Sequence, residues 1–253
     1  MPPSLDVLHA AVAFGAAFAA GLINAVAGGG TLITFPTLIW LGLPSIAANA
    51  TSTVVVWPGV MSTVWGYRQE LRSADRRIFA LVAPSVVGGL AGALLLRRTA
   101  TSVFDTLVPY LILFATLLFM VQEPIQRKLK TRQSTPWTAG AIMFQLAVAL
   151  YGGYFGAGIG ILMLAALSVL GLTDIHQMNG LRAFFGACVN GVAALYFIWA
   201  KMVYWPYVLI MVLGAIAGGY LGAHGARRMG HRAVRRTVVG VGFAMAVSLF
   251  IKH

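Results

Sequence analysis

An apolar stretch in the second half of the sequence contains polar side chains at regular intervals. Asn179, Arg182 and Asn190 lie between Ile175 and Trp199, and offsets of three and eleven positions place them on one face of a helix. Arginine stays charged and presents a planar fork that suits oxyanions. We therefore predict that Arg182 binds an anion, with Asn179 as a hydrogen-bond donor and Asn190 on the same face. The alternative is that Arg182 lies near the helix end and extends to the lipid headgroups.

A second polar group lies at the matching positions of the first half, where the sequence contains Asn49, Thr51 and Ser52. An oxyanion offers several acceptors, so hydroxyl and amide donors around one cation suit it. Asn24 and Gln145 either line the same cavity or bond neighbouring helices. The predicted substrate-binding residues are Asn24, Asn49, Thr51, Ser52, Asn179, Arg182 and Asn190.

Glycine-rich segments interrupt the apolar sequence once in each half, at residues 28–30 and 156–160. A helix that starts inside a membrane exposes N–H groups that attract anions, and such backbone is tolerated only beside protein or a water-filled cavity. The alternative role of these glycines is close helix packing, which we favour for glycines four positions apart, such as Gly88 and Gly92. The predicted hinge residues are Gly28, Gly29, Gly30, Gly156, Gly158 and Gly160.

The composition determines which solvent surrounds these elements. The chain has 253 residues, of which 59% are hydrophobic and 9% charged, against roughly 25% charged in soluble domains. These values predict an integral membrane protein, and apolar runs of nearly 20 residues predict helices rather than a barrel. The 18 Lys and Arg residues lie mainly between apolar segments, which argues against a nucleic-acid partner. The single cysteine, Cys188, excludes an internal disulfide and a multi-cysteine metal site.

Ten apolar segments can be traced along the chain. They cover residues 7–27, 31–43, 46–67, 78–96, 104–121, 137–157, 159–172, 175–199, 204–226 and 237–251. Basic residues concentrate in the connections after the third, fifth and ninth segments, so ten crossings would place both termini outside the cytoplasm and the central connection inside. The second and seventh segments are short, and the alternative is eight crossings with these two segments re-entrant.

The two halves form an internal repeat. An offset of 130 positions relates Gly28 to Gly158, Asn49 to Asn179 and several further pairs. Five segments are an odd number, so the second copy enters the membrane from the opposite side. We therefore predict an all-α polytopic membrane protein of two inverted repeats, with eight to ten transmembrane helices. Residues 1–121 form the first repeat, 122–136 a basic cytoplasmic linker and 137–253 the second repeat; such repeats are typical of secondary transporters.

Several strings in the sequence resemble one family of transporters. They are Gly21–Gly30, Asn49-Ala50-Thr51-Ser52, Tyr151–Gly160 and Asn179-Gly180-Leu181-Arg182. Together they are similar to the TauE/SafE family of sulfite and organosulfonate exporters, over both repeats. The resemblance implies a multi-pass secondary transporter of the bacterial inner membrane that moves sulfite, sulfoacetate or a related sulfur oxyanion and uses no cofactor. Members are often described with about eight spans, which agrees with ten segments only if the short ones are re-entrant.

Three functions are compatible with these observations. The preferred one is an exporter that works by alternating access, with a small anion as substrate and the lipid bilayer as its surroundings. A passive anion channel is the second, and a membrane-embedded enzyme or accessory protein of sulfur metabolism is the third. The six Asp and Glu residues lie at or beyond segment ends, so we do not expect an enzyme or a bound metal. The sequence leaves open whether the chain forms a homo-oligomer.

Overall fold

The computed structural model describes residues 6–26, 28–129, 139–170, 172, 174–225, 239–240, 243–244 and 246–247. Every regular element within these residues is a helix, which confirms the all-α class. The elements are α1 (Val7–Val26), α2 (Thr31–Trp40), α3 (Ser45–Gly66), α4 (Arg68–Arg72), the 3-10 helix η1 (Arg76–Leu81), α5 (Val82–Arg98), α6 (Thr101–Leu129), α7 (Ala139–Tyr154), α8 (Ile159–Val169), α9 (Ile175–Trp199) and α10 (Trp205–Gly225). Most of the tenth predicted segment, and the end of the predicted linker, lie outside the described residues.

Helix lengths agree with a polytopic membrane protein. Within the described residues, five helical stretches are long and apolar enough to cross a bilayer, namely Val7–Ala25, Arg76–Arg98, Thr101–Leu118, Ile175–Trp199 and Trp205–Gly222. The third segment forms the 22-residue helix α3, whose polar residues lower its hydropathy. With 10 and 11 residues, α2 and α8 rise about 15 Å at 1.5 Å per residue, roughly half of a 30 Å hydrocarbon core. Neither short helix crosses a bilayer alone.

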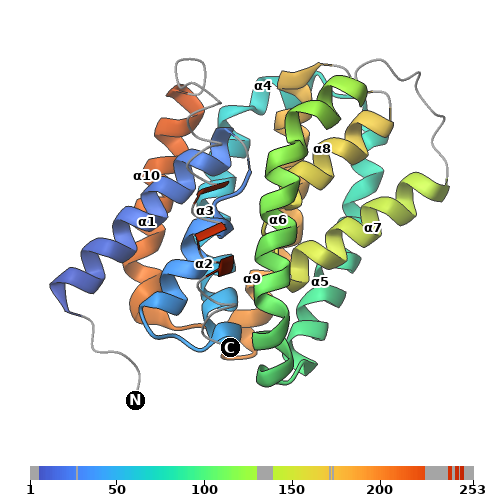
Figure 1. Ribbon diagram of the computed structural model, residues 1–253. Helices are drawn as coiled ribbons and strands as arrows, with labels where there is room; N and C mark the ends of the chain where they lie inside the picture. Colours follow the sequence, from blue (N-terminus) through green and yellow to red (C-terminus); the bar gives the residue numbers. More distant parts are fainter. Residues whose placement is uncertain are drawn as a thin grey trace.

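The described helices are related by an inverted pseudo-symmetry. Helices α1, α3 and α5 of the first half correspond to α7, α9 and α10 of the second half. The contact of α1 with α10 therefore corresponds to the contact of α7 with α5, and the contact of α3 with α10 to that of α9 with α5. At the centre, α3 packs against α9. Figure 1 shows α1 rising towards the middle and α2 returning downwards, while α7 descends and α8 rises. The inverted repeat is therefore confirmed.

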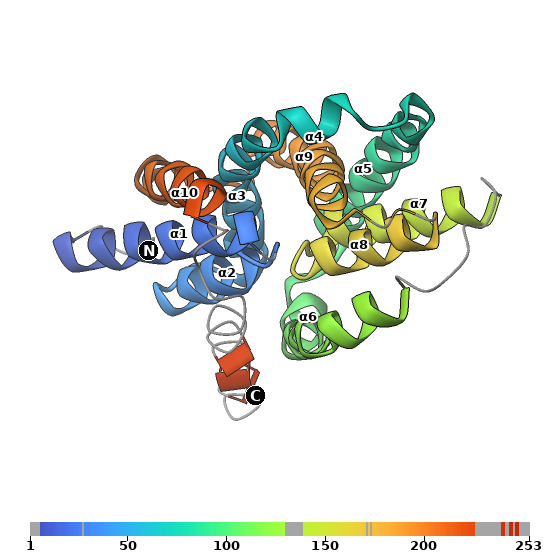
Figure 2. The same cartoon turned by 90° about the horizontal axis from the view of Figure 1, so that it is seen from above.

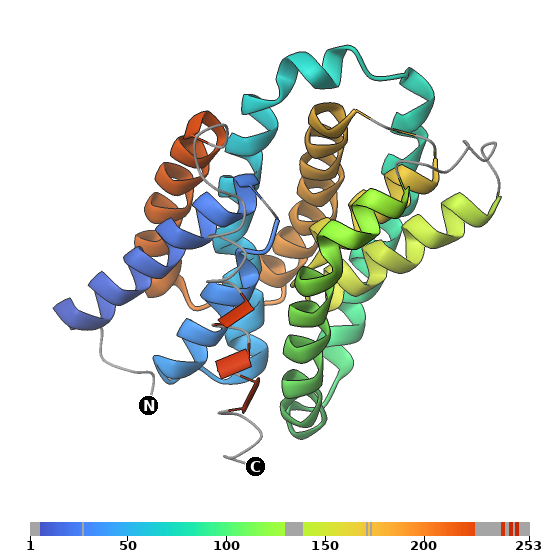
Figure 3. The same cartoon turned by 45° about the horizontal axis from the view of Figure 1, so that its top comes forward.

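The packing groups differ from the sequence repeats. Viewed from above, α1, α2, α3 and α10 form one group and α5 to α9 form the other (Figure 2). Each group thus contains helices from both halves of the chain, because α5 packs on α7 and α10 packs on α1. The short elements α4 and η1, drawn in cyan, pass over one end of the molecule and join α3 to α5 (Figure 3). We call these units the first group and the second group.

Glycines allow α5 to approach α7 closely, and α10 to approach α1 closely. A Cβ atom at Gly92 of α5 would overlap the carbonyl oxygen of Leu150 in α7. A Cβ at Gly218 of α10 would overlap the carbonyl oxygen of Phe18 in α1. In lipid there is no hydrophobic force between helices, so this close approach of backbones provides much of the packing energy.

Candidate functional site

Two helix breaks with the same geometry lie at the glycine-rich segments. Gly28, between α1 and α2, and Gly156, between α7 and α8, have left-handed φ values of 78° and 79°. Their N–H groups donate to the carbonyls of Ile23, at 3.1 Å, and Tyr151, at 3.3 Å. The structural offset here is therefore 128 positions, and the sequence pairing of Gly28 with Gly158 is wrong. The difference arises because α8 and its connection to α9 are each one residue longer than their counterparts.

The two breaks touch each other at the centre of the molecule. A Cβ atom at Gly160, in the first turn of α8, would lie 3.1 Å from the carbonyl oxygen of Gly28. A Cβ at Gly28 would lie 2.5 Å from Nη1 of Arg182. Glycine at position 28 therefore satisfies two requirements, the left-handed backbone and the space for the guanidinium.

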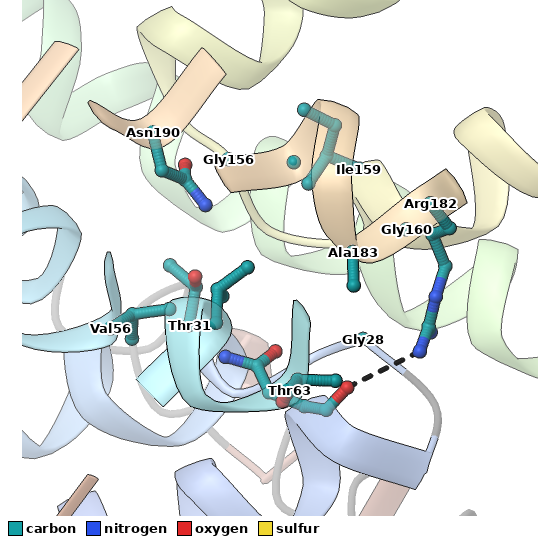
Figure 4. A pocket seen from close by; sticks show the side chains of 13 residues that line it. Gly28, Thr31, Val56, Thr63, Gly156, Ile159, Gly160, Arg182, Ala183 and Asn190 are labelled. Carbon is teal, nitrogen blue, oxygen red and sulfur yellow. Dashed lines mark hydrogen bonds between the residues drawn. The ribbon is translucent and has the colours of Figure 1, made fainter. Parts of the chain in front are cut away.

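Arg182 is a buried charge with one hydrogen bond to the described residues. Its side chain comes from α9 and is 2% exposed, so it does not extend to the headgroups. Nη2 donates to the carbonyl oxygen of Asn24 at 3.3 Å (Figure 4). Within the described part of the chain, the buried Nη1 has no hydrogen-bond partner, and no carboxylate forms a salt bridge with it. A buried charge of this kind carries a desolvation cost that a bound anion would offset.

Asn24 connects the guanidinium to the first helix break. Its Oδ1 accepts a hydrogen bond of 2.8 Å from the N–H of Gly30, the residue before α2. Its carbonyl oxygen accepts from Arg182. Since Asn24 belongs to the first group and Arg182 to the second, Asn24 joins the helix break of one group to the charge of the other.

A cavity of about 30 Å³ lies beside Arg182 (Figure 4). It is lined by Asn24, Gly28, Thr31, Val56, Val60, Thr63, Gly156, Ile159, Gly160, Arg182, Ala183, Gly186 and Asn190. One water requires roughly 10–15 Å³ on this measure, so the space suits a compact ligand. Thr31 and Ile159 are the first residues of α2 and α8, so the partial positive charges of two helix N-termini meet here.

The position of the cavity is asymmetric along the central helices. Val56, Val60 and Thr63 belong to the second half of α3, and Arg182 to the first half of α9. These halves lie towards α4, at the top of Figure 1. The cavity therefore occupies the α4 side of the interface between the two groups.

Of the predicted site residues, the structure brings three side chains and three hinge glycines together. They are Asn24, Arg182, Asn190, Gly28, Gly156 and Gly160. Gly30 and Gly158 precede α2 and α8, and Gly29 lies between Gly28 and Gly30; these three do not line the cavity. Asn179 is half-buried one turn before Arg182 and is also absent from the lining.

The predicted polar face of the first half bonds to the protein instead. Asn49 Nδ2 donates to the carbonyl oxygen of Tyr154 at 2.9 Å. Thr51 Oγ1 accepts from the N–H of Tyr204 at 3.0 Å, while the hydroxyl of Ser52 bonds the hydroxyl of Thr34 at 2.6 Å. None of the three predicted residues lines the cavity. Gln145 bonds a neighbouring helix, through Ser85 Oγ at 2.7 Å.

The lining residues on α3 were not among the predicted site residues. Val56 and Val60 lie 130 positions before Gly186 and Asn190, and all four line the cavity. Thr63 lies on the same helix face, because spacings of three and four repeat on one side of a helix. Applying the repeat offset to Asn190 would have identified this face.

The fold and the central cavity define an inverted-repeat membrane transporter. A family model described as "Sulfite exporter TauE/SafE" matches residues 13–249, and the chain belongs to this family. A "Probable membrane transporter protein" of Haemophilus influenzae is 26% identical over 250 residues, covering 98% of this chain and 96% of that protein. "Probable membrane transporter protein YfcA" of Escherichia coli strain K12 is also 26% identical, with 94% and 88% covered. No solved structure matches the chain.

Proposed function

We propose that the protein is a secondary transporter that exports a small sulfur-containing oxyanion, such as sulfite or an organosulfonate, across the bacterial inner membrane. The observation that carries this proposal is the buried Nη1 of Arg182, which has no partner among the described residues and lies at a central cavity. The description of the family supports the substrate class, and the bacterial relatives support the membrane.

The dimensions of the cavity favour a compact member of this class. A space of about 30 Å³ corresponds to only a few water molecules. Sulfite has four non-hydrogen atoms, whereas an organosulfonate such as sulfoacetate adds a carbon chain and a second charged group. Sulfite therefore fits with less rearrangement, and a larger organosulfonate requires the two groups to separate.

The lining residues offer donors suited to a pyramidal oxyanion. Arg182 Nη1 supplies charge, the side chains of Thr31, Thr63 and Asn190 supply neutral polar groups, and the N-termini of α2 and α8 add partial charge. The apolar residues Val56 and Val60 on the facing helix form an apolar part of the wall, and a less polar surrounding strengthens these interactions. Anion binding offsets the uncompensated charge of Arg182.

Alternating access provides the transport step in this proposal. The exposed arginines of α4 and η1 support a cytoplasmic location for the α4 side under the positive-inside rule, and in this proposal the anion enters from there. On the far side, the bond from Asn49 to Tyr154 and the edge-to-face contact of Phe35 with Phe155, at 5.3 Å between centroids, join the first group to the second. Release to the outside requires these contacts to separate.

Transport assays in proteoliposomes test the proposal. Purified protein should exchange sulfite saturably, and Arg182→Ala should reduce the rate at least tenfold because the charge is lost. Arg68→Ala is the control, since that arginine is exposed on α4. Equal rates in wild type and Arg182→Ala would contradict the proposal, and a flux that rises linearly with concentration without trans-stimulation would indicate a channel.

A further inference from the structure

A second hollow lies on the lipid-facing surface, at the end of the molecule opposite α4. It has a volume of about 630 Å³ and is lined by Leu90, Leu94, Arg97, Arg98, Tyr196 and Trp199. The first four residues belong to α5 and the last two to the final turn of α9. Both helices end at the lower edge of Figure 1, far from the central cavity. We call this hollow the α5–α9 groove.

Arg97 is held in a fixed position in the groove. Its guanidinium lies over the rings of Tyr196 and Trp199, at 5.9 and 5.6 Å from their centroids. Its Nη1 donates to the hydroxyl oxygen of Tyr196 at 3.1 Å. An arginine on two aromatic rings retains its charge while losing conformational freedom. It therefore forms a preorganised contact for an anion.

The two arginines leave net positive charge in the groove. Arg98 is exposed beside Arg97, and among the described residues neither forms a salt bridge. Both lie on the side of the membrane where the positive-inside rule disfavours arginine. The dipole at the C-terminus of α5 accounts for some of the preference for basic residues, but not for their position at the rim of a groove.

The rest of the groove is apolar and faces the bilayer. Leu94 lies about one turn before Arg97, and Leu90 about one turn before Leu94, so the groove continues from the charged rim along α5. Leu90 is 37% and Trp199 71% exposed. Tyr and Trp side chains at this position are typical of the headgroup level. A water-soluble anion would use the arginines and leave the leucines without a role.

We propose that the α5–α9 groove binds an anionic phospholipid. Its phosphate lies between Arg97 and Arg98, and one acyl chain lies along Leu90 and Leu94. Charge complementarity favours an anionic headgroup over a zwitterionic one, because the two arginines offer charge-assisted hydrogen bonds to the phosphate and no net negative charge from the described residues offsets them. The lipid bridges α5 and α9 within the second group and stabilises their packing.

Lipid titration of the purified full-length chain tests this assignment. Delipidated protein in a neutral detergent is titrated with phosphatidylglycerol or phosphatidylcholine, and bound lipid is counted by native mass spectrometry. We expect at least fivefold tighter binding of phosphatidylglycerol, and loss of this preference in Arg97→Gln/Arg98→Gln. Arg68→Gln is the matched control, because Arg68 lies over Trp65 at 5.3 Å at the other end of the molecule. It should keep the preference.

A second variant separates a lipid from a free anion. Leu94→Trp fills the apolar part of the groove but retains both arginines, so it should also weaken phosphatidylglycerol binding at least fivefold. Inorganic phosphate should not compete at millimolar concentration. Equal binding of the two lipids, a preference that survives the double substitution, or competition by phosphate with full binding to Leu94→Trp would each overturn the proposal.

Discussion

The guanidinium of Arg182 is buried, and of its two terminal nitrogens one forms a hydrogen bond to the described residues. Nη2 bonds the carbonyl of Asn24, and Nη1 has no partner among the described residues. The penalty for burying an ion is several kcal/mol even after relaxation. A bound anion would reduce this penalty. A shift of Arg182 towards the anion would change its hydrogen bond to Asn24, which in turn bonds the N–H of Gly30. In the proposed mechanism, ligand binding would therefore be linked to the first helix break.

Gly28→Ala should impair the site through Arg182. The added methyl group would lie 2.5 Å from Nη1, so the guanidinium must move. Gly158→Ala is the matched control, because its φ of 76° carries the same backbone strain, while Gly158 does not line the cavity and a Cβ there meets Ala115 at 3.4 Å. We expect similar losses of stability, but a KM for sulfite raised at least fivefold more by Gly28→Ala. Equal KM values would show that contact with Arg182 does not matter.

The sequence predicted part of the site at this scale. Arg182 and Asn190 could be predicted because a polar residue in an apolar helix is energetically costly and therefore rare. The spacing of the two residues shows that they share one helix face. Asn49, with Thr51 and Ser52, satisfies the same criteria but bonds to neighbouring backbone and side chains. Periodicity identifies the polar face of a helix, but it does not show whether a cavity or a carbonyl lies opposite.

Among the elements, the short helices and the small-residue interfaces determine the architecture. Interruption of the helix at Gly28 and at Gly156 allows α2 and α8 to start near the centre of the molecule, where their N-termini face the cavity. Close contact of α5 with α7, and of α1 with α10, then holds the two groups together internally. Rigid groups around a central cavity are what alternating access requires.

Gly92→Leu should destabilise the second group. Its Cβ would overlap the carbonyl oxygen of Leu150, and overpacking typically costs about 1–3 kcal/mol. Gly15→Leu serves as control, because Gly15 of α1 is exposed and a Cβ there meets nothing within 4 Å. Thermal unfolding in detergent should show a lower Tm for Gly92→Leu and an unchanged Tm for Gly15→Leu. An unchanged Tm for Gly92→Leu would contradict close packing of α5 on α7.

Helix existence could be predicted from the sequence, and helix boundaries less well. Apolar length and glycine clusters predicted all nine of the segments that the described residues test. The offset at the hinges was wrong by two positions, because an extra residue in α8 and another in the following connection are invisible without the helix ends. Likewise, α6 continues to Leu129 beyond the predicted end at Val121, since polar helix formers extend a helix past its apolar stretch.

For the molecule as a whole, exchange of helices between the repeats is the main structural result. Because α5 packs on α7 and α10 on α1, movement of one group against the other deforms the connections of both repeats. The element pair α4 and η1 joins the groups at one end (Figure 3). The sequence predicted the inverted repeat from the offset and the odd segment number. It did not predict the exchange, because hydrophobic patterns do not specify which helices are neighbours.

Cysteine labelling in cells should establish the orientation. In a Cys188→Ser background, Arg68→Cys reports on the α4 side and Arg98→Cys on the opposite side; both positions are exposed. A membrane-impermeant maleimide added to intact cells should label Arg98→Cys and leave Arg68→Cys unlabelled until the membrane is opened. Labelling of both from outside would contradict crossing of the membrane by α5, and the reverse pattern would contradict entry of the anion from the cytoplasm.

The most direct test of anion binding at Arg182 is the thermal stability of purified protein across sulfite, sulfoacetate, thiosulfate, sulfate and chloride. A ligand that binds the folded state raises Tm by mass action. At a ligand concentration of one hundred times Kd, the free energy of unfolding rises by about 2.7 kcal/mol. Sulfite should raise the Tm of wild type, and the shift should vanish in Arg182→Gln, which should be no less stable without ligand because an uncompensated charge is removed. A sulfite shift of equal size in Arg182→Gln, or no shift with any anion in wild type, would contradict anion binding at this site.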